Sequence, residues 1–206
     1  MEVVVENQAI LTNHFQTWED YVGTMKADYR RRVRQLALPF SGIQKQQFAC
    51  SRFESLMYDQ YLEVLKRSKG KLETLSLEFF RNLPSNFNLT AFYNAGKLIG
   101  WYISSTFHEK CYFFLGGLDY SVNRQFNTYF NILLNVLREG IEKGASVIDL
   151  GQTAEIPKLR LGGKLVEKTM GAYHSNRIMR SLLKAGKSLL EYSTVVQETH
   201  VFKEIR

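Results

Sequence analysis

The chain has 206 residues and a formal net charge of +7, from 27 basic and 20 acidic residues. Hydrophobic residues make up 45% and charged residues 23%, which excludes an intrinsically disordered chain. The length fits one domain. The excess of positive charge favours an anionic partner, such as a phosphate-bearing cofactor, a nucleotide-linked substrate or RNA, although a solvated basic face explains it equally well.

Membrane spans, metal sites and disulfides are not indicated. No apolar run approaches the roughly 20 residues that cross a bilayer, and the opening residues MEVVVENQ lack the long apolar segment of a signal peptide. We therefore expect a cytoplasmic protein. Cys50 and Cys111 lie far apart, and the four histidines follow no metal-ligand spacing.

The first part of the chain has the apolar spacing of helices. Thr17 has the position of a helix cap, with Asp20 three residues later, and apolar residues recur at helical spacing as far as Val33. We expect this helix to end near Pro39 and Gly42. A second amphipathic helix is predicted over residues 53–65, and a short third helix over 77–83.

The pattern then alternates as in strands. Three strands are predicted over 87–93, 97–106 and 111–115, and the short turns between them indicate an antiparallel meander. The rest alternates between helices over 130–141, 154–161 and 176–184 and strands over 146–150 and 165–173. This order predicts an α/β (α+β) fold, with a mixed sheet that has helices on both faces.

Two glycine-containing loops are predicted beyond strand ends, where mixed sheets commonly bind ligands. Glycine allows the backbone to approach a ligand closely. The same residues are also explained as turns and caps, since Thr153 has the position of a cap for the next helix. The first loop begins at Gly116 and Gly117, and the second contains Gly151, Gln152 and Thr153.

Four segments resemble a known family. They are GKLIGW, YFFLGGLDYSVNRQFNTYFNILL, IEKGASVIDLGQTAEIPKLRLGGKL and AYHSNRIMRSLL, and the helix WEDYVGTMKADYRRRVRQ matches less specifically. Over about residues 15–185, the chain resembles the FemABX peptidoglycan aminoacyl ligases of the GNAT fold, and more closely the bacterial FemAB-like, acetyltransferase-like proteins. The resemblance implies a GNAT-like fold, with a largely antiparallel mixed sheet flanked by helices.

The same resemblance implies a division of the chain. It places a basic helix and connection at 15–50, a GNAT-like core at 51–185 and a C-terminal tail or helix at 186–206. The FemABX ligases contain two such domains and this chain has room for one. We therefore expect a single GNAT-like domain, which is the C-terminal half of a longer protein.

The resemblance also implies an activity, the transfer of an acyl or aminoacyl group to an amine. The co-substrate would be acyl-CoA or aminoacyl-tRNA, with no permanently bound cofactor, and the acceptor would be an anionic, nucleotide-linked molecule. The chain lacks the Q/RxxGxG/A loop that cradles pyrophosphate in many proteins of this fold.

Three residues are candidates for the chemistry. Lys158 matches the lysine before the FG or LG pair of the family motif, and its charge would stabilise an oxyanion or a phosphate. Asp149 and His174 are candidate proton acceptors. The alternatives are a solvated helix lysine, a turn-forming aspartate and a structural histidine. If Lys158 is catalytic, its replacement by alanine is expected to abolish transfer and to leave the fold intact.

Further residues are candidate ligand contacts, and each has a structural alternative as a core aromatic or a surface charge. The basic helix is also a weak candidate for RNA binding. Three hypotheses follow: an acyltransferase, a non-catalytic module that binds an anionic ligand or a protein, and an RNA-binding module. The candidate contacts are Tyr120, Arg124, Tyr129, Arg160, Tyr29 and Arg30.

Overall fold

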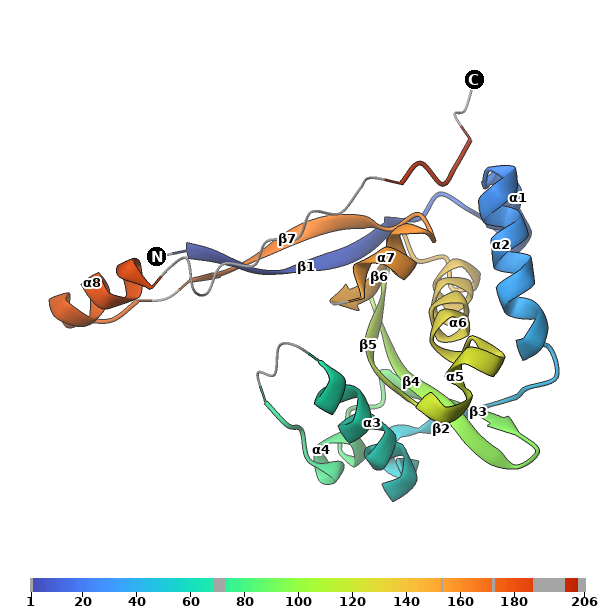
Figure 1. Ribbon diagram of the computed structural model, residues 1–206, viewed down its shortest axis with the longest axis horizontal. Coiled ribbons are helices and arrows are strands. Elements are labelled where there is room, and N and C mark those ends of the chain that lie inside the picture. The colour runs from blue at the N-terminus through green and yellow to red at the C-terminus, as the bar shows by residue number, and fades with distance from the viewer. Residues whose placement is uncertain (1, 69–72, 153, 172, 187–198, 204–206) are drawn as a thin grey trace.

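The computed structural model describes residues 2–68, 73–152, 154–171, 173–186 and 199–203. A seven-stranded sheet, in the order β2-β3-β4-β5-β6-β1-β7, has helices on both faces (Figure 1). This confirms the predicted α/β fold. The strands are β1 (Glu2–Thr12), β2 (Gln44–Ala49), β3 (Phe87–Asn94), β4 (Lys97–Phe107), β5 (Lys110–Leu118), β6 (Val147–Gln152) and β7 (Lys164–Gly171).

The described residues also form eight α-helices and two short 3-10 helices. Two hydrophobic clusters lie on the two faces of the sheet because neighbouring side chains of a strand point in opposite directions. Tyr102 of β4 belongs to the cluster beneath α1, α2 and α6, whereas Trp101 and Ile103 belong to the cluster beneath α3 and α4. The helices are α1 (Trp18–Thr24), α2 (Ala27–Ala37), η1 (Leu38–Phe40), η2 (Cys50–Arg52), α3 (Ser55–Arg67), α4 (Leu77–Arg81), α5 (Tyr120–Phe126), α6 (Thr128–Glu142), α7 (Glu155–Leu159) and α8 (Arg177–Ala185).

The sheet is antiparallel except for one pair. The predicted meander β3-β4-β5 is confirmed, and β6 then pairs in parallel with β5 after the crossover through α6. β1 lies between β6 and β7 and is antiparallel to both. This strand was not among those expected from the sequence, because pairing with residues so distant in the chain leaves no local pattern.

The prediction of one helix from Thr17 to Pro39 is wrong. Thr17 forms the expected capping box with Asp20, but the chain is extended at Met25 and a new helix begins at Ala27. Met25 forms a β-bridge with Phe202, and its neighbour Lys26 donates its N–H to the carbonyl of Val201 at 2.9 Å. Pairing with a C-terminal segment therefore interrupts the helix at Met25, although the apolar spacing of the sequence is helical on both sides of it.

Other differences concern β2, β5 and α5. The polar edge strand β2, QKQQFA, shows no apolar alternation and was not predicted. β5 continues through Gly116 and Gly117, which were predicted to begin a loop, and α5 follows it almost directly. Among the described helices, none combines the length and the apolar character needed to cross a bilayer.

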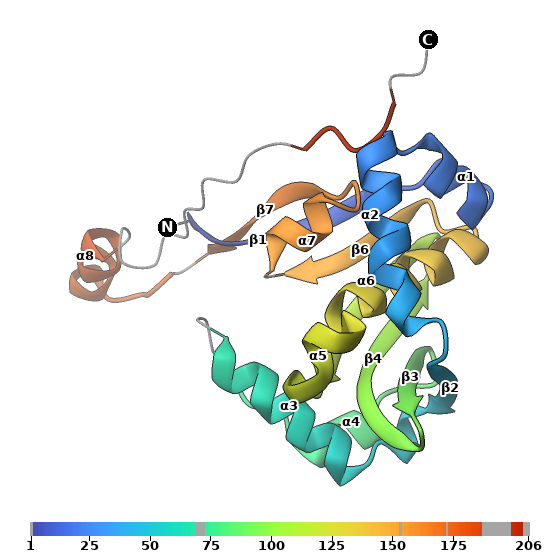
Figure 2. The same cartoon turned by 45° about the vertical axis from the view of Figure 1, so that its right-hand side comes forward.

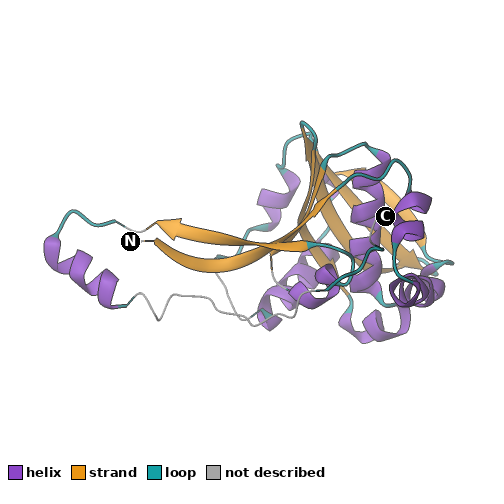
Figure 3. Cartoon of the chain, turned by 90° about the horizontal axis from the view of Figure 1, so that it is seen from above, coloured by secondary structure: helices purple, strands orange, loops and turns teal. Residues whose placement is uncertain are grey.

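An arm projects from the body of the protein. The first half of β1 pairs with β7 alone, because the pairing of β1 with β6 begins only at Gln8. This two-stranded ribbon extends away from the packed helices and carries α8 beyond its end (Figures 1 and 3).

Candidate functional site

The parallel strands β5 and β6 separate after a short contact. They pair at three positions, ending at Tyr112 with Asp149, although β5 continues to Leu118 and β6 to Gln152. The pairing of β5 with β4 shifts at the same point, where Phe114 is an extra residue. A β-bulge of this kind bends its strand and increases its twist. Beyond this point β5 and β6 are no longer paired, and this unpaired stretch between the two strands is called the opening below. β6 runs on to its end beside α7 (Figure 2).

The end of β6 has its own irregularity at Gly151. Its φ of 76° lies in the left-handed region, which glycine adopts without steric cost. The pairing with β1 shifts there by one residue. A β-carbon on Gly151 would lie 3.3 Å from the ring of Phe113 on β5. A larger residue at position 151 would therefore be strained by this backbone conformation and would crowd Phe113.

Lys158 of α7 lies directly behind this turn. The residue is 1% exposed, so the interpretation of a solvated helix lysine is wrong. Its Nζ donates to the carbonyl oxygens of Gly151 at 2.9 Å and Gln152 at 2.6 Å. A positive charge is thus buried next to the end of β6, where it orients two consecutive peptide groups.

Asp149 of β6 contacts the same turn. Its Oδ1 accepts the N–H of Gly151 at 2.8 Å, and its Oδ2 accepts the side-chain amide of Gln8 from β1. Burial raises the pKa of Asp149, against the opposing effects of the Gly151 N–H and of Lys168, Lys158 and Lys110. The carboxylate therefore has an increased affinity for a proton and lies close enough to Lys158 to interact with its charge.

The first strand completes this cluster, and the sequence analysis missed its contribution. Asn7 donates its side-chain amide to Oε1 of Glu155 at 2.9 Å, which ties β1 to the start of α7. The buried Oε1 of Gln8 has no hydrogen-bond partner within the described residues. Only the strand order, which places β1 beside β6, brings Asn7 and Gln8 to this cluster.

Gly116 and Gly117 serve packing in this structure. A β-carbon on Gly117 would lie 2.5 Å from Nε1 of Trp101, its partner across the β4-β5 pair. The indole in turn donates to the carbonyl of Met57 at 3.1 Å. Gly117 is therefore needed to admit a buried tryptophan beside β5, and a β-carbon on Gly116 would lie 3.0 Å from the carbonyl oxygen of Trp101.

Three more candidate contacts follow the end of β5. Tyr120 is partly exposed beneath the guanidinium of Arg67, 4.1 Å from the ring centre, and Arg124 is exposed on α5. Burial, with the proximity of Tyr120, raises the pKa of Tyr129. These residues follow the carboxyl end of β5, whereas Lys158 follows the carboxyl end of β6. The two groups therefore lie at the ends of the two diverging strands.

The amino end of α5 already holds a carboxylate. Asp119 accepts the N–H of Ser121 at 2.9 Å and forms an ion pair with Lys97 at 3.0 Å. Burial raises the pKa of Asp119, but the bonds from Ser121 and Lys97 outweigh it and lower the pKa overall. An ionised cap at this helix end disfavours a second anion there.

The remaining candidates are not brought to the opening. His174 is exposed beyond the end of β7, and its Nδ1 accepts the N–H of Asn176 at 3.1 Å. From Val166, which pairs with Gln8, the five residue steps to Gly171 carry the chain roughly 17 Å away from the body, at about 3.3 Å per residue. Arg160 is exposed, and Thr153 lies outside the described residues.

The basic helix lies elsewhere. Tyr29 packs against the hydrophobic cluster beneath α6. Arg30 donates to the carbonyls of Gly23 at 3.3 Å and Met25 at 3.4 Å, so it closes the junction between α1 and α2. Arg31 pairs with Asp28 on the surface at 3.0 Å.

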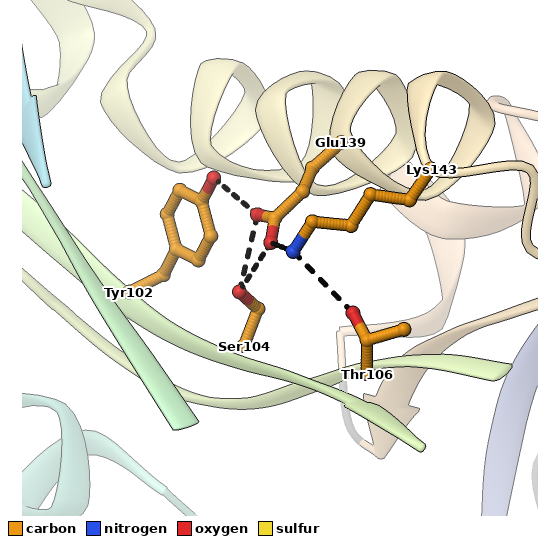
Figure 4. Close-up of polar contacts among 5 residues, drawn as sticks. All are labelled: Tyr102, Ser104, Thr106, Glu139 and Lys143. Atoms are coloured by element: carbon orange, nitrogen blue, oxygen red, sulfur yellow. Dashed lines mark hydrogen bonds and ion pairs between the residues drawn. The ribbon is translucent and has the colours of Figure 1, made fainter. Parts of the chain in front are cut away.

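A second polar cluster lies between α6 and β4 (Figure 4). The carboxylate of Glu139 accepts hydrogen bonds from the hydroxyl groups of Tyr102 and Ser104, each at 2.9 Å. Lys143, one helical turn further along α6, pairs with the same carboxylate at 2.7 Å and lies 3.4 Å from the hydroxyl of Thr106. This cluster joins a helix to the sheet.

Solved structures have the same arrangement of sheet and helices. FemX aligns with a TM-score of 0.60 and 11% identity, over 88% of this chain and 64% of its own length. The chain has the GNAT-like acyltransferase fold. L-PGS from Bacillus licheniformis aligns with a TM-score of 0.56 and 12% identity, over 92% of this chain and 67% of its own.

A third structure, assigned as the C-terminal domain of a lysylphosphatidylglycerol synthetase from Agrobacterium fabrum, aligns with a TM-score of 0.58 and 10% identity. That alignment covers 92% of this chain and 66% of the other. The chain thus spans about two thirds of the length of these proteins. Its sequence matches no family model and none of the curated proteins compared with it.

Proposed function

We propose that this protein is an acyl- or aminoacyltransferase that forms an amide on an amine acceptor. One observation carries the proposal. The buried ammonium of Lys158 and the carboxylate of Asp149 contact the same residue, Gly151, at the end of β6: Lys158 donates to its carbonyl and Asp149 accepts its N–H. Crevices beyond the carboxyl ends of sheet strands commonly bind ligands.

The two charges match the needs of the reaction. The amine nitrogen attacks the ester carbon, its bond to carbon forms and the bond to the leaving alcohol breaks. Asp149 accepts the proton that the amine loses, and the burial that raises its pKa strengthens it as an acceptor. Lys158 supplies a fixed positive charge for the oxyanion that develops. The proton then passes to the leaving oxygen.

We infer that the donor is an aminoacyl ester, as in aminoacyl-tRNA, rather than acyl-CoA. Asp119 occupies the helix end that follows β5, and the sequence lacks the glycine-rich loop that holds pyrophosphate. The net charge of +7 suits tRNA and an anionic, nucleotide-linked acceptor. With the resemblance to FemAB-like proteins, this indicates a peptidoglycan precursor as acceptor and the bacterial cytoplasm as location.

A labelled-donor assay tests the proposal. The purified chain is incubated with a nucleotide-linked muropeptide and either labelled alanyl-tRNA or labelled acetyl-CoA, and label in the acceptor is measured. We expect transfer from alanyl-tRNA. Lys158→Met should lower the rate roughly 10²–10³-fold, as expected for loss of one group that stabilises an oxyanion. Methionine is preferred to alanine because it leaves less empty volume at a buried site.

The matched control is Lys143→Met, which removes a lysine from the other polar cluster. Its transfer rate should stay within about threefold of the unsubstituted protein, because Lys143 belongs to the joint between α6 and β4. Equal rates for Lys158→Met and the unsubstituted protein, at equal thermal stability, would remove Lys158 from the mechanism.

The burial of Lys158 also favours a second candidate, a non-catalytic module. An ammonium that is 1% exposed and donates to two backbone carbonyls is well suited to hold a turn in place. A module of this kind binds the muropeptide in calorimetry but transfers label from neither donor. Turnover with alanyl-tRNA excludes it.

A further inference from the structure

Helix α8 has two chemically distinct faces. At about 100° per residue, the sequence RIMRSLLKA places its large apolar residues along one side and its polar residues along the other. No acidic residue occurs between Glu167 and Glu191. The apolar side contains Ile178, Met179, Leu182 and Leu183, and the polar side includes Arg177, Arg180 and Ser181.

The apolar side of α8 is exposed. Ile178 is 71% exposed and Leu182 is 60% exposed, and Tyr173, just before the helix, is 78% exposed. None of the described residues of α8 belongs to either hydrophobic cluster of the protein. The ribbon of β1 and β7 holds the helix away from the body (Figure 3). A flat surface can therefore reach α8 without meeting the helices that cover the sheet.

We propose that α8 docks on an anionic membrane surface. A short helix with an exposed apolar face and a polar face that carries basic but no acidic groups lies in the interface of a bilayer, with its apolar side chains among the acyl chains and its basic groups near the lipid phosphates. The exposed Tyr173 suits the headgroup level, where aromatic residues gather. This surface is separate from the opening between β5 and β6 and does not depend on the proposed transfer reaction.

Charge decides between a membrane and other partners. Face-to-face packing of α8 on a second copy would bring Arg177 and Arg180 near their own counterparts in a protein of net charge +7. RNA would use the arginines but leave the apolar side in water. An anionic bilayer satisfies both faces at once.

Vesicle co-sedimentation of the full chain tests this inference. The vesicles are phosphatidylcholine alone or phosphatidylcholine with 30% phosphatidylglycerol, a composition chosen for its negative charge. We expect binding to the anionic vesicles that weakens with salt, and little binding to the neutral ones. Ile178→Gln combined with Leu182→Gln should weaken binding about tenfold or more. Arg177→Gln and Arg180→Gln should each weaken it about fivefold.

Matched controls separate α8 from the general positive charge. Leu56→Gln and Arg31→Gln alter an exposed leucine and an exposed arginine on the body and should leave binding unchanged. The inference is overturned by three results. These are equal losses in the α8 and control variants, absence of binding to anionic vesicles at low salt, and dimerisation or tRNA binding through α8 without vesicle binding.

Discussion

Two polar clusters lie on the same sheet, and they differ in the groups that contact the buried charge. In the cluster of Glu139, the carboxylate meets two hydroxyl groups and the ammonium of Lys143, all from side chains of α6 and β4. In the cluster of Lys158, the ammonium meets two backbone carbonyls at the end of β6. The first joins two regular elements, and the second holds an irregular turn.

Under the proposed function, the first cluster serves the structure and the second serves the reaction. Side chains that neutralise one another across a helix and a strand stabilise their packing and need no ligand. In the proposed reaction, the charge of Lys158 lies at the end of β6, beyond the point where β5 and β6 cease to pair. The comparison predicts that substitutions in the first cluster change stability, and that substitutions in the second mainly change transfer.

The largest expected stability effect is at Glu139. Glu139→Ala leaves the hydroxyl groups of Tyr102 and Ser104 without their acceptor and removes the partner of Lys143, which should destabilise the fold by about 3 kcal/mol. For a chain of this size, that lowers Tm by roughly 6–12 °C. Thermal unfolding followed by circular dichroism measures it. Glu142→Ala, which removes an exposed ion pair with Arg138, should change stability by less than about 0.5 kcal/mol.

The next effect is at Gly117. The β-carbon of Gly117→Ala meets the indole of Trp101, so the fold should lose about 2 kcal/mol of stability. Gly42→Ala, where no atom lies within 4 Å of the added carbon, is the control. A loss of transfer in Gly117→Ala at unchanged Tm would instead favour the ligand role that the sequence suggested.

A smaller effect depends on pH. Burial raises the pKa of Asp149 above its ordinary value of 3.8, so the folded protein binds more protons than the unfolded chain just above that pH. The contribution of Asp149 to stability is therefore present below 3.8 and lost as pH rises through the raised pKa. Asp149→Asn removes this loss. Denaturant unfolding of both proteins at several acidic pH values should show the variant gaining relative stability as pH rises, and parallel curves would contradict the assignment.

The smallest effect is at Arg31. Its ion pair with Asp28 is largely exposed, so Arg31→Gln should change the free energy of unfolding by less than about 0.5 kcal/mol. Affinity for tRNA, measured at several salt concentrations, provides the second readout. A clear fall in affinity with a shallower salt slope would assign the basic helix to RNA contact.

Short-range patterns determined most of the elements. The capping box at Thr17 and Asp20 and the alternation along β3 and β4 were visible in the sequence because both depend on residues a few positions apart. The family motif also directed attention to Lys158. Local patterns also predicted one continuous helix where the chain is interrupted at Met25, and a loop where β5 continues through Gly117.

The sequence by itself thus determined the types of element, the α/β class and the segment that holds the candidate site. Only the tertiary structure decided that β1 enters between β6 and β7, that a bulge at Phe114 separates β5 from β6, and that Lys158 is buried behind the turn at Gly151. The physical reason is one of distance along the chain. Helix and strand periodicity follow from neighbouring residues, whereas strand order and burial depend on partners more than a hundred residues away.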